Sequence, residues 1–328
     1  MTRADRRTRT TSSTGALRGA PVGGGADDLP RVVLVTGASS GIGRATAVRL
    51  ARPGAALALV ARGEQGLAAV AAECRELGAR VSTHPLDVAD DAAVEACVAD
   101  VVRREGRLDA AVTSAAVVAY GDFTEVPADV FERVIRTDVV GTANVARHAL
   151  RRFREQGDGT LLLMGSVLGQ IAAPWMSPYS TSKWAVRGFA RGLVIENRPY
   201  RDVHVRVVSP GGVETPVYRR AATYLGRHGK PPFPVYAPET VADRVVRVLA
   251  KPATAQRDTR AGWANPVMVA GFTLLPGVYD AAVRPALWLL GIDRKRVADT
   301  SGHVFDPSER SEPQGVDAPA RRRTRAAR

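Results

Sequence analysis

A tyrosine and a lysine, Tyr179 and Lys183, stand four positions apart in the stretch SPYSTSKWAV. Four residues make about one turn of an α-helix, so a helix here would present the phenol and the ammonium on one face. The residues between them are small and would leave room for a bound group. A phenol beside an ammonium is suited to proton transfer, because the cation favours the phenolate. Taken alone, the pair would more simply belong to an amphipathic surface helix.

A glycine-rich stretch between a strand and a helix changes that interpretation. The β-branched run RVVLVTG (31–37) leads directly into TGASSGIGRA. Its glycines are spaced G-x-x-x-G-x-G, which allows a tight turn and a close approach of the backbone to a pyrophosphate. The helix that follows offers free N–H groups and the positive end of its dipole to the anion. We therefore predict a dinucleotide cradle made of Gly37, Ser39, Ser40, Gly41, Ile42 and Gly43.

A nicotinamide cofactor in this cradle would give the tyrosine a chemical role. Hydride transfer to a carbonyl leaves an alkoxide that needs a proton. A free tyrosine has a pKa near 10, so use as a base near neutral pH requires a pKa lowered by up to roughly 3 units. Lys183 and the charged nicotinamide ring would favour the phenolate, and Lys183 could also hold the ribose. Ser166, which ends a predicted strand, would orient the substrate oxygen.

The end of the second predicted strand, AALALVA (55–61), indicates which dinucleotide is bound. An acid at this position would bind the ribose 2′-hydroxyl of NAD. This chain instead has Arg62, whose guanidinium suits a 2′-phosphate, and Arg44 is close to the same pocket in sequence. We expect NADP(H) in preference to NAD(H). The alternative is that Arg62 is a solvated arginine and that Glu64 binds the ribose.

Strands and helices alternate along the chain between residues 31 and 255. Continuous apolar strands separated by helices predict a parallel sheet covered on both faces. The fold class is therefore α/β, a doubly wound Rossmann fold of about seven strands. Strands are expected at 31–37, 55–61, 79–88, 108–114, 159–166 and 203–212, and helices at about 42–52, 64–77, 90–105, 127–155, 178–197 and 238–249.

Further motifs occur in an order that is specific to one family. They are LDV (86–88), Ser166, YSTSK (179–183) and PGGVET (210–215), after TGASSGIG. With them the chain resembles a classical short-chain dehydrogenase/reductase over about residues 31–255. The resemblance implies hydride transfer between the nicotinamide and a carbonyl or secondary alcohol, with Ser166, Tyr179 and Lys183 as the catalytic triad.

The same resemblance implies further cofactor contacts. Asp87 would bond the adenine amine, with the Val88 backbone nearby. The nicotinamide would be flanked by Pro210 and Gly211, and its carboxamide would be held by Val213 and Thr215.

Two positions depart from the family pattern. The usual Asn-Asn-Ala-Gly after the fourth strand is TSAA (113–116) here, which keeps some hydrogen bonding but loses a glycine. In RTDVVG (136–141), Asp138 replaces the family's fourth catalytic residue, an asparagine. An aspartate keeps the shape and the backbone carbonyl but loses the NH₂ donor. We expect a reduced or pH-shifted activity, and a carboxylate near Lys183 should raise the lysine pKa.

The C-terminal part is expected to extend the domain. Residues 256–306 form an extension whose segment 265–292 is apolar but broken by prolines and charges. We expect it to pack on the domain or on a partner subunit, with peripheral membrane contact as the alternative. The preceding loop, 216–236, carries Tyr218, Tyr224, Phe233 and Tyr236, which suit either an apolar substrate or simple packing. The resemblance also implies a dimer or tetramer built on helices 127–155 and 178–197.

Composition limits the other possibilities. Hydrophobic residues make up 45 % of the 328 residues, enough for a sizeable core. Two cysteines, Cys74 and Cys97, exclude a disulfide scaffold or metal cluster and indicate a reduced, cytoplasmic setting. The Arg-rich ends, 1–30 and 307–328, read as disordered basic tails.

Two rival functions remain, and the first is suggested by the net charge of +13. Nucleic-acid binding rests on that charge alone, because the sequence has no recognition helix or aromatic platform. A non-catalytic NADP(H)-binding regulator is favoured by Asp138 and TSAA, but the intact Ser/Tyr/Lys set opposes it.

Overall fold

A parallel sheet of seven strands forms the centre of the molecule. The computed structural model describes residues 29–255 and 257–307. The strand order is β12-β7-β6-β4-β1-β2-β3, and every pairing in this sheet is parallel. The strands are β1 (Val32–Thr36), β2 (Ala56–Ala61), β3 (Arg80–Pro85), β4 (Ala110–Thr113), β6 (Asp158–Met164), β7 (Asp202–Pro210) and β12 (Asp258–Ala261). The predicted doubly wound fold of about seven strands is confirmed.

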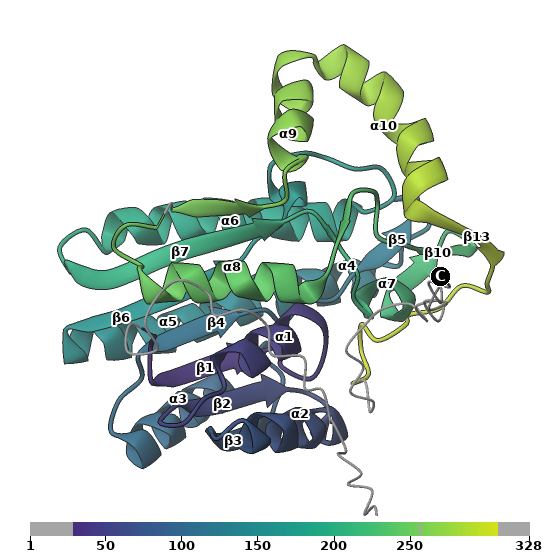
Figure 1. The fold of residues 1–328 in the computed structure, drawn as a ribbon. Coiled ribbons are helices and arrows are strands. Elements are labelled where there is room, and N and C mark those ends of the chain that lie inside the picture. The colour runs from purple at the N-terminus through teal and green to yellow at the C-terminus, as the bar shows by residue number, and fades with distance from the viewer. Residues whose placement is uncertain (1–28, 256, 308–328) are drawn as a thin grey trace, which may run out of the picture.

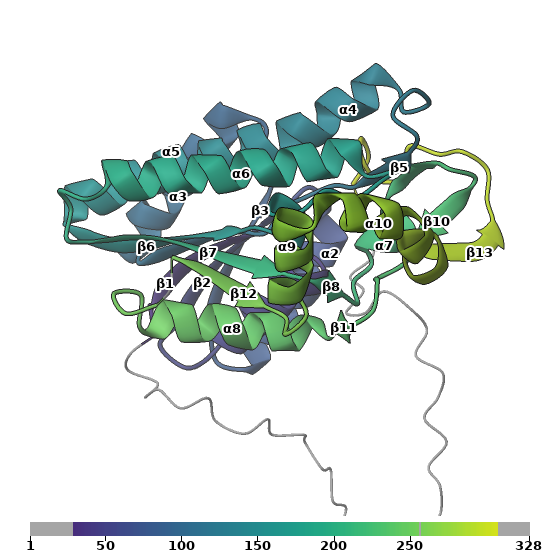
Figure 2. The ribbon, with the colours of Figure 1, turned by 90° about the horizontal axis from the view of Figure 1, so that it is seen from above.

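Helices cover both faces of the sheet and enclose two apolar cores (Figures 1 and 2). Strand residues alternate between the cores, so Val33 and Val35 pack in one and Val32 and Leu34 in the other. One face carries α3 (Asp91–Glu105), α5 (Gly141–Gln156) and α6 (Ser177–Glu196). The other carries α1 (Gly41–Leu50), α2 (Glu64–Glu76) and α8 (Pro238–Ala250).

The long helix expected at 127–155 has a change of pitch in its middle. It consists of α4 (Ala128–Ile135), a π-helical turn η2 (Arg136–Val140) and α5. A π turn inserts an extra residue into the helix and often marks a functional site. Here it contains Asp138, and it turns that side chain towards the core beneath α6.

The sheet reaches further along the chain than the sequence indicated. β12 begins at Asp258, so the seventh strand lies beyond residue 255, where we placed the end of the Rossmann unit. After it come α9 (Asn265–Leu274), α10 (Pro276–Gly291) and β13 (Ile292–Arg296). The two helices stand out from the sheet as an arch (Figure 1).

Short elements connect the main strands and helices. They are β5 (Ala119–Gly121), η3 (Val167–Gly169), β8 (Gly212–Val213), α7 (Val217–Arg220), β9 (Ala222–Tyr224), β10 (Arg227–Gly229) and β11 (Val235–Tyr236). In the part of the chain that the structure describes, no helix combines the length and apolarity needed to cross a bilayer. The tails predicted as disordered fall almost entirely outside the described residues.

Candidate active site

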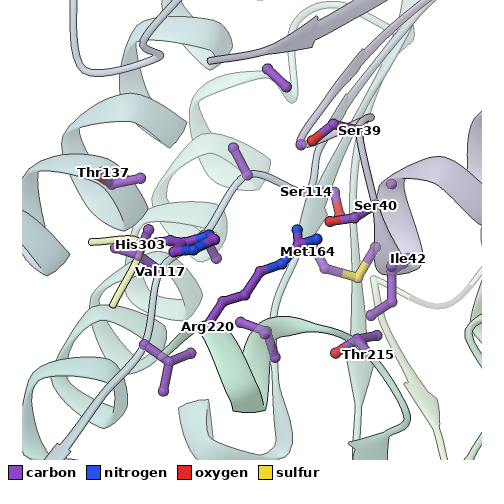
Figure 3. A pocket seen from close by; sticks show the side chains of 18 of the residues that line it. Ser39, Ser40, Ile42, Ser114, Val117, Thr137, Met164, Thr215, Arg220 and His303 are labelled. Atoms are coloured by element: carbon purple, nitrogen blue, oxygen red, sulfur yellow. The ribbon is translucent and has the colours of Figure 1, made fainter. Parts of the chain in front are cut away.

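A pocket of about 220 Å³ opens where β1 and β4 end side by side. Chain connections leave these neighbouring strands in opposite directions, and ligands of doubly wound sheets bind at such a point. Figure 3 shows Ser39, Ser40 and Ile42 on one side and His303 on the other, with Arg220 extending between them. The predicted site residues that line it are Gly37, Ser39, Ser40, Gly41, Ile42, Gly43, Arg62, Asp87, Val88, Tyr179, Lys183, Pro210 and Thr215. Ser166, Asp138, Gly211 and Val213 lie outside the lining.

The glycine cradle is closely packed against the segment TSAA. Gly37 has φ +65°, and a Cβ there would lie 2.8 Å from the backbone of Ser114 and Ala115. A Cβ on Gly43 would lie 2.2 Å from the Gly37 carbonyl oxygen, so both positions require glycine. The backbone N–H groups of Ser114 and Ala115 donate to Thr36 Oγ1 at 3.0 and 3.2 Å. The altered family motif thus still ties β4 to the cradle through Thr36, the first residue of TGASSGIG, which was not among the predicted site residues.

Tyr179 and Lys183 line another part of the pocket, and Ser166 contacts Tyr179 from outside the lining. Ser166 ends the loop after β6, and its Oγ accepts the Leu168 N–H at 3.1 Å and bonds the Tyr179 hydroxyl. Lys183 Nζ lies 5.3 Å from the centre of the Tyr179 ring and donates to the Met164 carbonyl at 3.4 Å. The helical spacing of the pair, predicted from the sequence, brings the ammonium beneath the phenol.

Burial controls the protonation of this group. It raises the pKa of Tyr179, the Asp138 carboxylate raises that pKa further, and the Ser166 hydroxyl lowers it. The pKa of Lys183 is lowered by burial, while Asp138 acts in the opposite direction. The expected effect of the carboxylate is confirmed, because Asp138 does raise the lysine pKa, but desolvation of the ammonium is the larger cause and the net pKa is lowered.

Asp138 is fully enclosed between the π turn and α6. Its Oδ1 accepts the Val117 N–H at 2.9 Å, and its Oδ2 accepts the Ser182 hydroxyl at 3.0 Å. Oδ2 also lies 3.9 Å from Lys183 Nζ. Burial raises the pKa of Asp138 to about 6, against the Lys183 charge and both hydrogen bonds. Ser182 was not among the predicted residues, although it lies inside the YSTSK motif.

Arg62 is bound by a distant part of the same chain. Its guanidinium donates to the backbone carbonyls of His303, Val304, Phe305 and Asp306 at 2.6 to 3.2 Å. We call residues 300–306 the strap. Because His303 also lines the pocket, the strap forms one wall at the end where the sequence placed a 2′-phosphate.

Besides Arg62, several contacts anchor the strap, and in one of them the His303 N–H donates to the Arg220 carbonyl at 2.8 Å. Val304 is fully buried in a valine-rich cluster under β5 and α4. Thr300 and Thr223 exchange backbone hydrogen bonds of 2.8 and 3.0 Å. Arg133 connects the strap to the LDV motif (86–88), since it donates to the Val304 carbonyl at 3.3 Å and pairs with Asp87. No spacing in the sequence links positions 62, 133 and 304, so these contacts were not predicted.

The sequence offered Arg44 and Glu64, besides Arg62, as residues near the adenosine ribose. Arg44 pairs with Glu73 at 2.6 Å and does not line the pocket. Glu64 is exposed at the start of α2 and does not line it either. Of these three, only Arg62 lies on the pocket wall.

The loop aromatics separate into distinct environments. Tyr218 and the buried Tyr120 lie close enough to Tyr179 for it to raise the pKa of both, after burial as the main cause. Phe233 is exposed, and Tyr236 accepts the Trp263 N–H at 3.0 Å. Tyr218 is therefore the loop aromatic that reaches Tyr179.

Comparison with known proteins places these features in a family. The model of the short chain dehydrogenase family matches residues 31–224. Levodione reductase of Leifsonia aquatica is 36 % identical over 198 residues, 60 % of this chain and 74 % of the reductase.

Two solved structures share the fold and each covers 70 % of this chain. One is an alcohol dehydrogenase from Thermococcus sibiricus complexed with 5-hydroxy-NADP, with a TM-score of 0.62, 30 % identity and 95 % of its own chain covered. The other is a short chain dehydrogenase from Mycobacterium paratuberculosis bound to NAD, with a TM-score of 0.63, 27 % identity and 95 % coverage. The protein belongs to the short-chain dehydrogenase family and is an oxidoreductase that acts on CH–OH or C=O groups with NAD(P).

Proposed function

We propose that the protein is an NADP(H)-dependent carbonyl reductase or alcohol dehydrogenase with Tyr179 as its general acid or base. The observation that carries this proposal is the position of Tyr179 and Lys183 in one pocket with the glycine cradle. The cofactor, when bound, supplies or takes the hydride. The chain's own residues then have to hold the substrate oxygen and move one proton.

The proton step follows from the contacts of Tyr179. In reduction, the Tyr179 hydroxyl donates its proton to the forming alkoxide, while Ser166 orients the same oxygen. A high pKa for the phenol, which burial provides, keeps the proton in place for donation. In oxidation, Tyr179 must accept the proton, and the Lys183 ammonium beneath the ring stabilises the phenolate.

The preference for NADP(H) rests on Arg62. Its present partners are neutral carbonyls, and a 2′-phosphate would be a stronger, charge-assisted partner for the same donors. The two solved relatives carry different dinucleotides, 5-hydroxy-NADP in one and NAD in the other. The residue at the end of β2 is therefore the feature on which the preference depends.

The surroundings of Tyr179 favour an apolar substrate. Apolar and aromatic side chains pack around it, and Lys183 and the buried Asp138 lie behind it on the core side. Such a wall binds a carbonyl compound by its hydrocarbon part and leaves the polar recognition to Ser166 and Tyr179. The residues are Val118, Tyr120, Leu168, Met176, Val217 and Tyr218.

We further propose a homo-dimer or tetramer built on α5 and α6, as the family resemblance implies. A shallow groove between these helices is lined by Leu150, Phe189 and Leu193, together with three arginines of α5 and one glutamate of each helix. A symmetric partner would place the arginines of one copy against the glutamates of the other.

The decisive experiment compares wild type with Tyr179→Phe in NADPH-dependent reduction of a panel of apolar ketones. Loss of turnover with unchanged NADPH affinity in a fluorescence titration supports the proposal. Tyr200→Phe, which removes an exposed hydroxyl far from the pocket, is the matched control. Retained cofactor binding without turnover in wild type would instead favour the non-catalytic regulator. Binding of neither NADPH nor NADH would refute both functions.

A further inference from the structure

The arch formed by α9 and α10 exposes an unusual amount of apolar surface. Eight of the seventeen exposed large hydrophobic residues in the described chain lie between positions 263 and 290. They are Trp263, Val267, Leu274, Leu275, Val278, Trp288, Leu289 and Leu290. Exposed apolar residues scattered singly are normal, but a contiguous group of this size marks a contact surface.

The tip of the arch is its most exposed part. Leu274, Leu275 and Val278 are 74 %, 58 % and 66 % exposed, around the turn at Pro276. Figure 1 shows this turn as the point farthest from the sheet. Between Trp263 and Gly291 the only charged residues are Asp280 and Arg284.

The inner side of the arch is held in a defined position. Tyr279 donates its hydroxyl hydrogen to the Ala172 carbonyl at 2.7 Å, and its ring meets Phe272 at 5.2 Å. Further along the same helix, α10, Trp288 packs against Trp175 with ring centres 5.4 Å apart, and Arg284 lies over the Trp175 ring. The arch is therefore attached to the body by its inner face, and its outer face and tip have no partner among the described residues.

A strongly basic groove lies at the foot of the arch. Its volume is about 740 Å³, and it runs between α8, β12 and the first residues of α9. Five cations line it: Arg187, Arg244, Arg247, Lys251 and Arg260. The single acid in its lining, Asp258, is already engaged by Ser209 at 2.7 Å and by Arg187 at 3.7 Å. The groove therefore carries a surplus of positive charge next to an apolar projection.

The groove and the tip are on the same side of the molecule. β12 is the edge strand of the sheet, and the arch rises beyond that edge (Figure 1). α9 has ten residues and so a length of about 15 Å. A tip buried about 5–10 Å in the headgroup and acyl boundary would leave the groove within about one Debye length of the lipid phosphates.

We propose that the arch and the basic groove form a docking surface for a membrane that contains anionic phospholipids. The apolar tip would enter the headgroup region, and the five cations would face the lipid phosphates. Charge argues against a second copy as the occupant. A two-fold contact between arches would bring the basic groove of each copy to the same interface, where like charges repel.

Vesicle co-sedimentation of the full chain tests this proposal. The probes are vesicles of phosphatidylcholine alone and vesicles with about 30 % phosphatidylglycerol, each at low and high salt. Wild type should bind the anionic vesicles and lose most of that binding at high salt. The double variant Leu274→Ser/Leu275→Ser should weaken binding by about tenfold or more, because both side chains are exposed and lose their apolar contact with lipid.

Two controls separate the arch from general charge effects. Leu77→Ser removes an exposed leucine on the opposite part of the sheet and should bind as wild type does. Arg244→Gln/Arg247→Gln should weaken binding to anionic vesicles several-fold, whereas Arg103→Gln/Arg104→Gln on α3 should have a smaller effect. The Arg-rich chain ends are common to all variants, so they cancel in these comparisons.

Three outcomes would overturn the proposal. One is wild type that binds neither vesicle. Another is a Leu274→Ser/Leu275→Ser variant that binds as tightly as wild type. The third is a lipid-free dimer, measured by light scattering, that the same two substitutions dissociate, because a second copy would then cover the arch.

Discussion

The two ends of the cofactor pocket are built in different ways. At the end that we propose to be catalytic, Ser166 follows β6, and Tyr179 and Lys183 lie on α6, two elements packed in the core. At the other end, Arg62 at the tip of β2 is held by carbonyls of the strap, about 240 positions later in the chain. The first end is fixed by the sheet, whereas the second depends on a surface segment that closes over it.

We expect proton transfer to depend on the first end of the pocket and the choice between NADPH and NADH to depend on the second. Proton transfer needs atoms held within a few tenths of an ångström, and core elements provide that rigidity. In the proposed function, selection between NADPH and NADH would depend on the 2′-phosphate at the pocket rim, where hydrogen bonds to the strap compete for the Arg62 guanidinium. Substitutions at the catalytic end should therefore change turnover, and those at the strap should change the affinity for NADPH relative to NADH.

The largest effect is expected for Lys183→Met. Removal of the ammonium 5.3 Å from the Tyr179 ring leaves the phenolate without its nearest cation, and kcat/KM should fall about 10³-fold. Steady-state kinetics with NADPH measure this, and Lys295→Met, at an exposed lysine, is the control. A loss of less than tenfold would mean that the catalytic end does not depend on Lys183.

The next effect concerns the strap. Val304→Asp places a carboxylate in a fully buried apolar cluster, so the strap should detach and free the Arg62 donors. NADPH should then bind about tenfold more tightly, with NADH affinity within about twofold of wild type. Fluorescence titration measures both, and thermal denaturation checks that the domain remains folded.

Phe305→Ser is the matched control for that experiment. Phe305 lies beside Val304 in the strap but is 40 % exposed, so the strap should stay anchored and both affinities unchanged. Weaker NADPH binding in Val304→Asp would contradict the competition and make the strap a part of the phosphate site.

A third prediction returns to the catalytic end through Asp138. In Asp138→Asn the amide oxygen can accept the Val117 N–H and the amide nitrogen can donate to Ser182, so the geometry is kept. The carboxylate that raises the pKa of Tyr179 is gone. The acidic limb of the pH profile for alcohol oxidation should therefore move down by about one unit, with less than tenfold change at the optimum.

The same substitution should alter the pH dependence of stability. The pKa of Asp138 is raised from 3.8 to about 6, so its favourable contribution is complete below the lower value and lost as pH rises through the higher one. Relative to Asp138→Asn, wild type should lose up to about 3 kcal/mol of unfolding free energy between these values. Urea denaturation across this range measures the difference, and parallel curves for the two proteins would contradict it.

Short-range patterns account for what could be predicted from the sequence. The six strands predicted from apolar runs all occur, and the glycine spacing marks the turn at which Gly37 and Gly43 leave no room for a Cβ. Tyr179 and Lys183 meet because a helix turns once in about four residues.

The features that were not predicted have no local signature. β12 is the short, polar DTRA at a sheet edge, and only its partner β7 makes it a strand. The π turn at Arg136–Val140 continues a regular helical pattern, so its extra residue is not visible in the apolar spacing. The strap joins Arg62 to residues 303–306 through backbone carbonyls, which every residue type has, and composition cannot indicate which carbonyls they are.

The smallest effect is expected for Arg44→Ala. This substitution tests whether Arg62 alone binds the 2′-phosphate or whether Arg44 also contributes. Sequence proximity placed Arg44 beside Arg62, but its guanidinium pairs with Glu73 of α2 at 2.6 Å. NADPH affinity should therefore change by less than about twofold, and stability by less than about 1 kcal/mol, as for other partly exposed ion pairs. Arg62→Ala in the same titration should weaken NADPH binding much more and leave NADH binding unchanged. If Arg44→Ala matched that loss, the phosphate would be read by both arginines, and the strap would control only half of the selectivity.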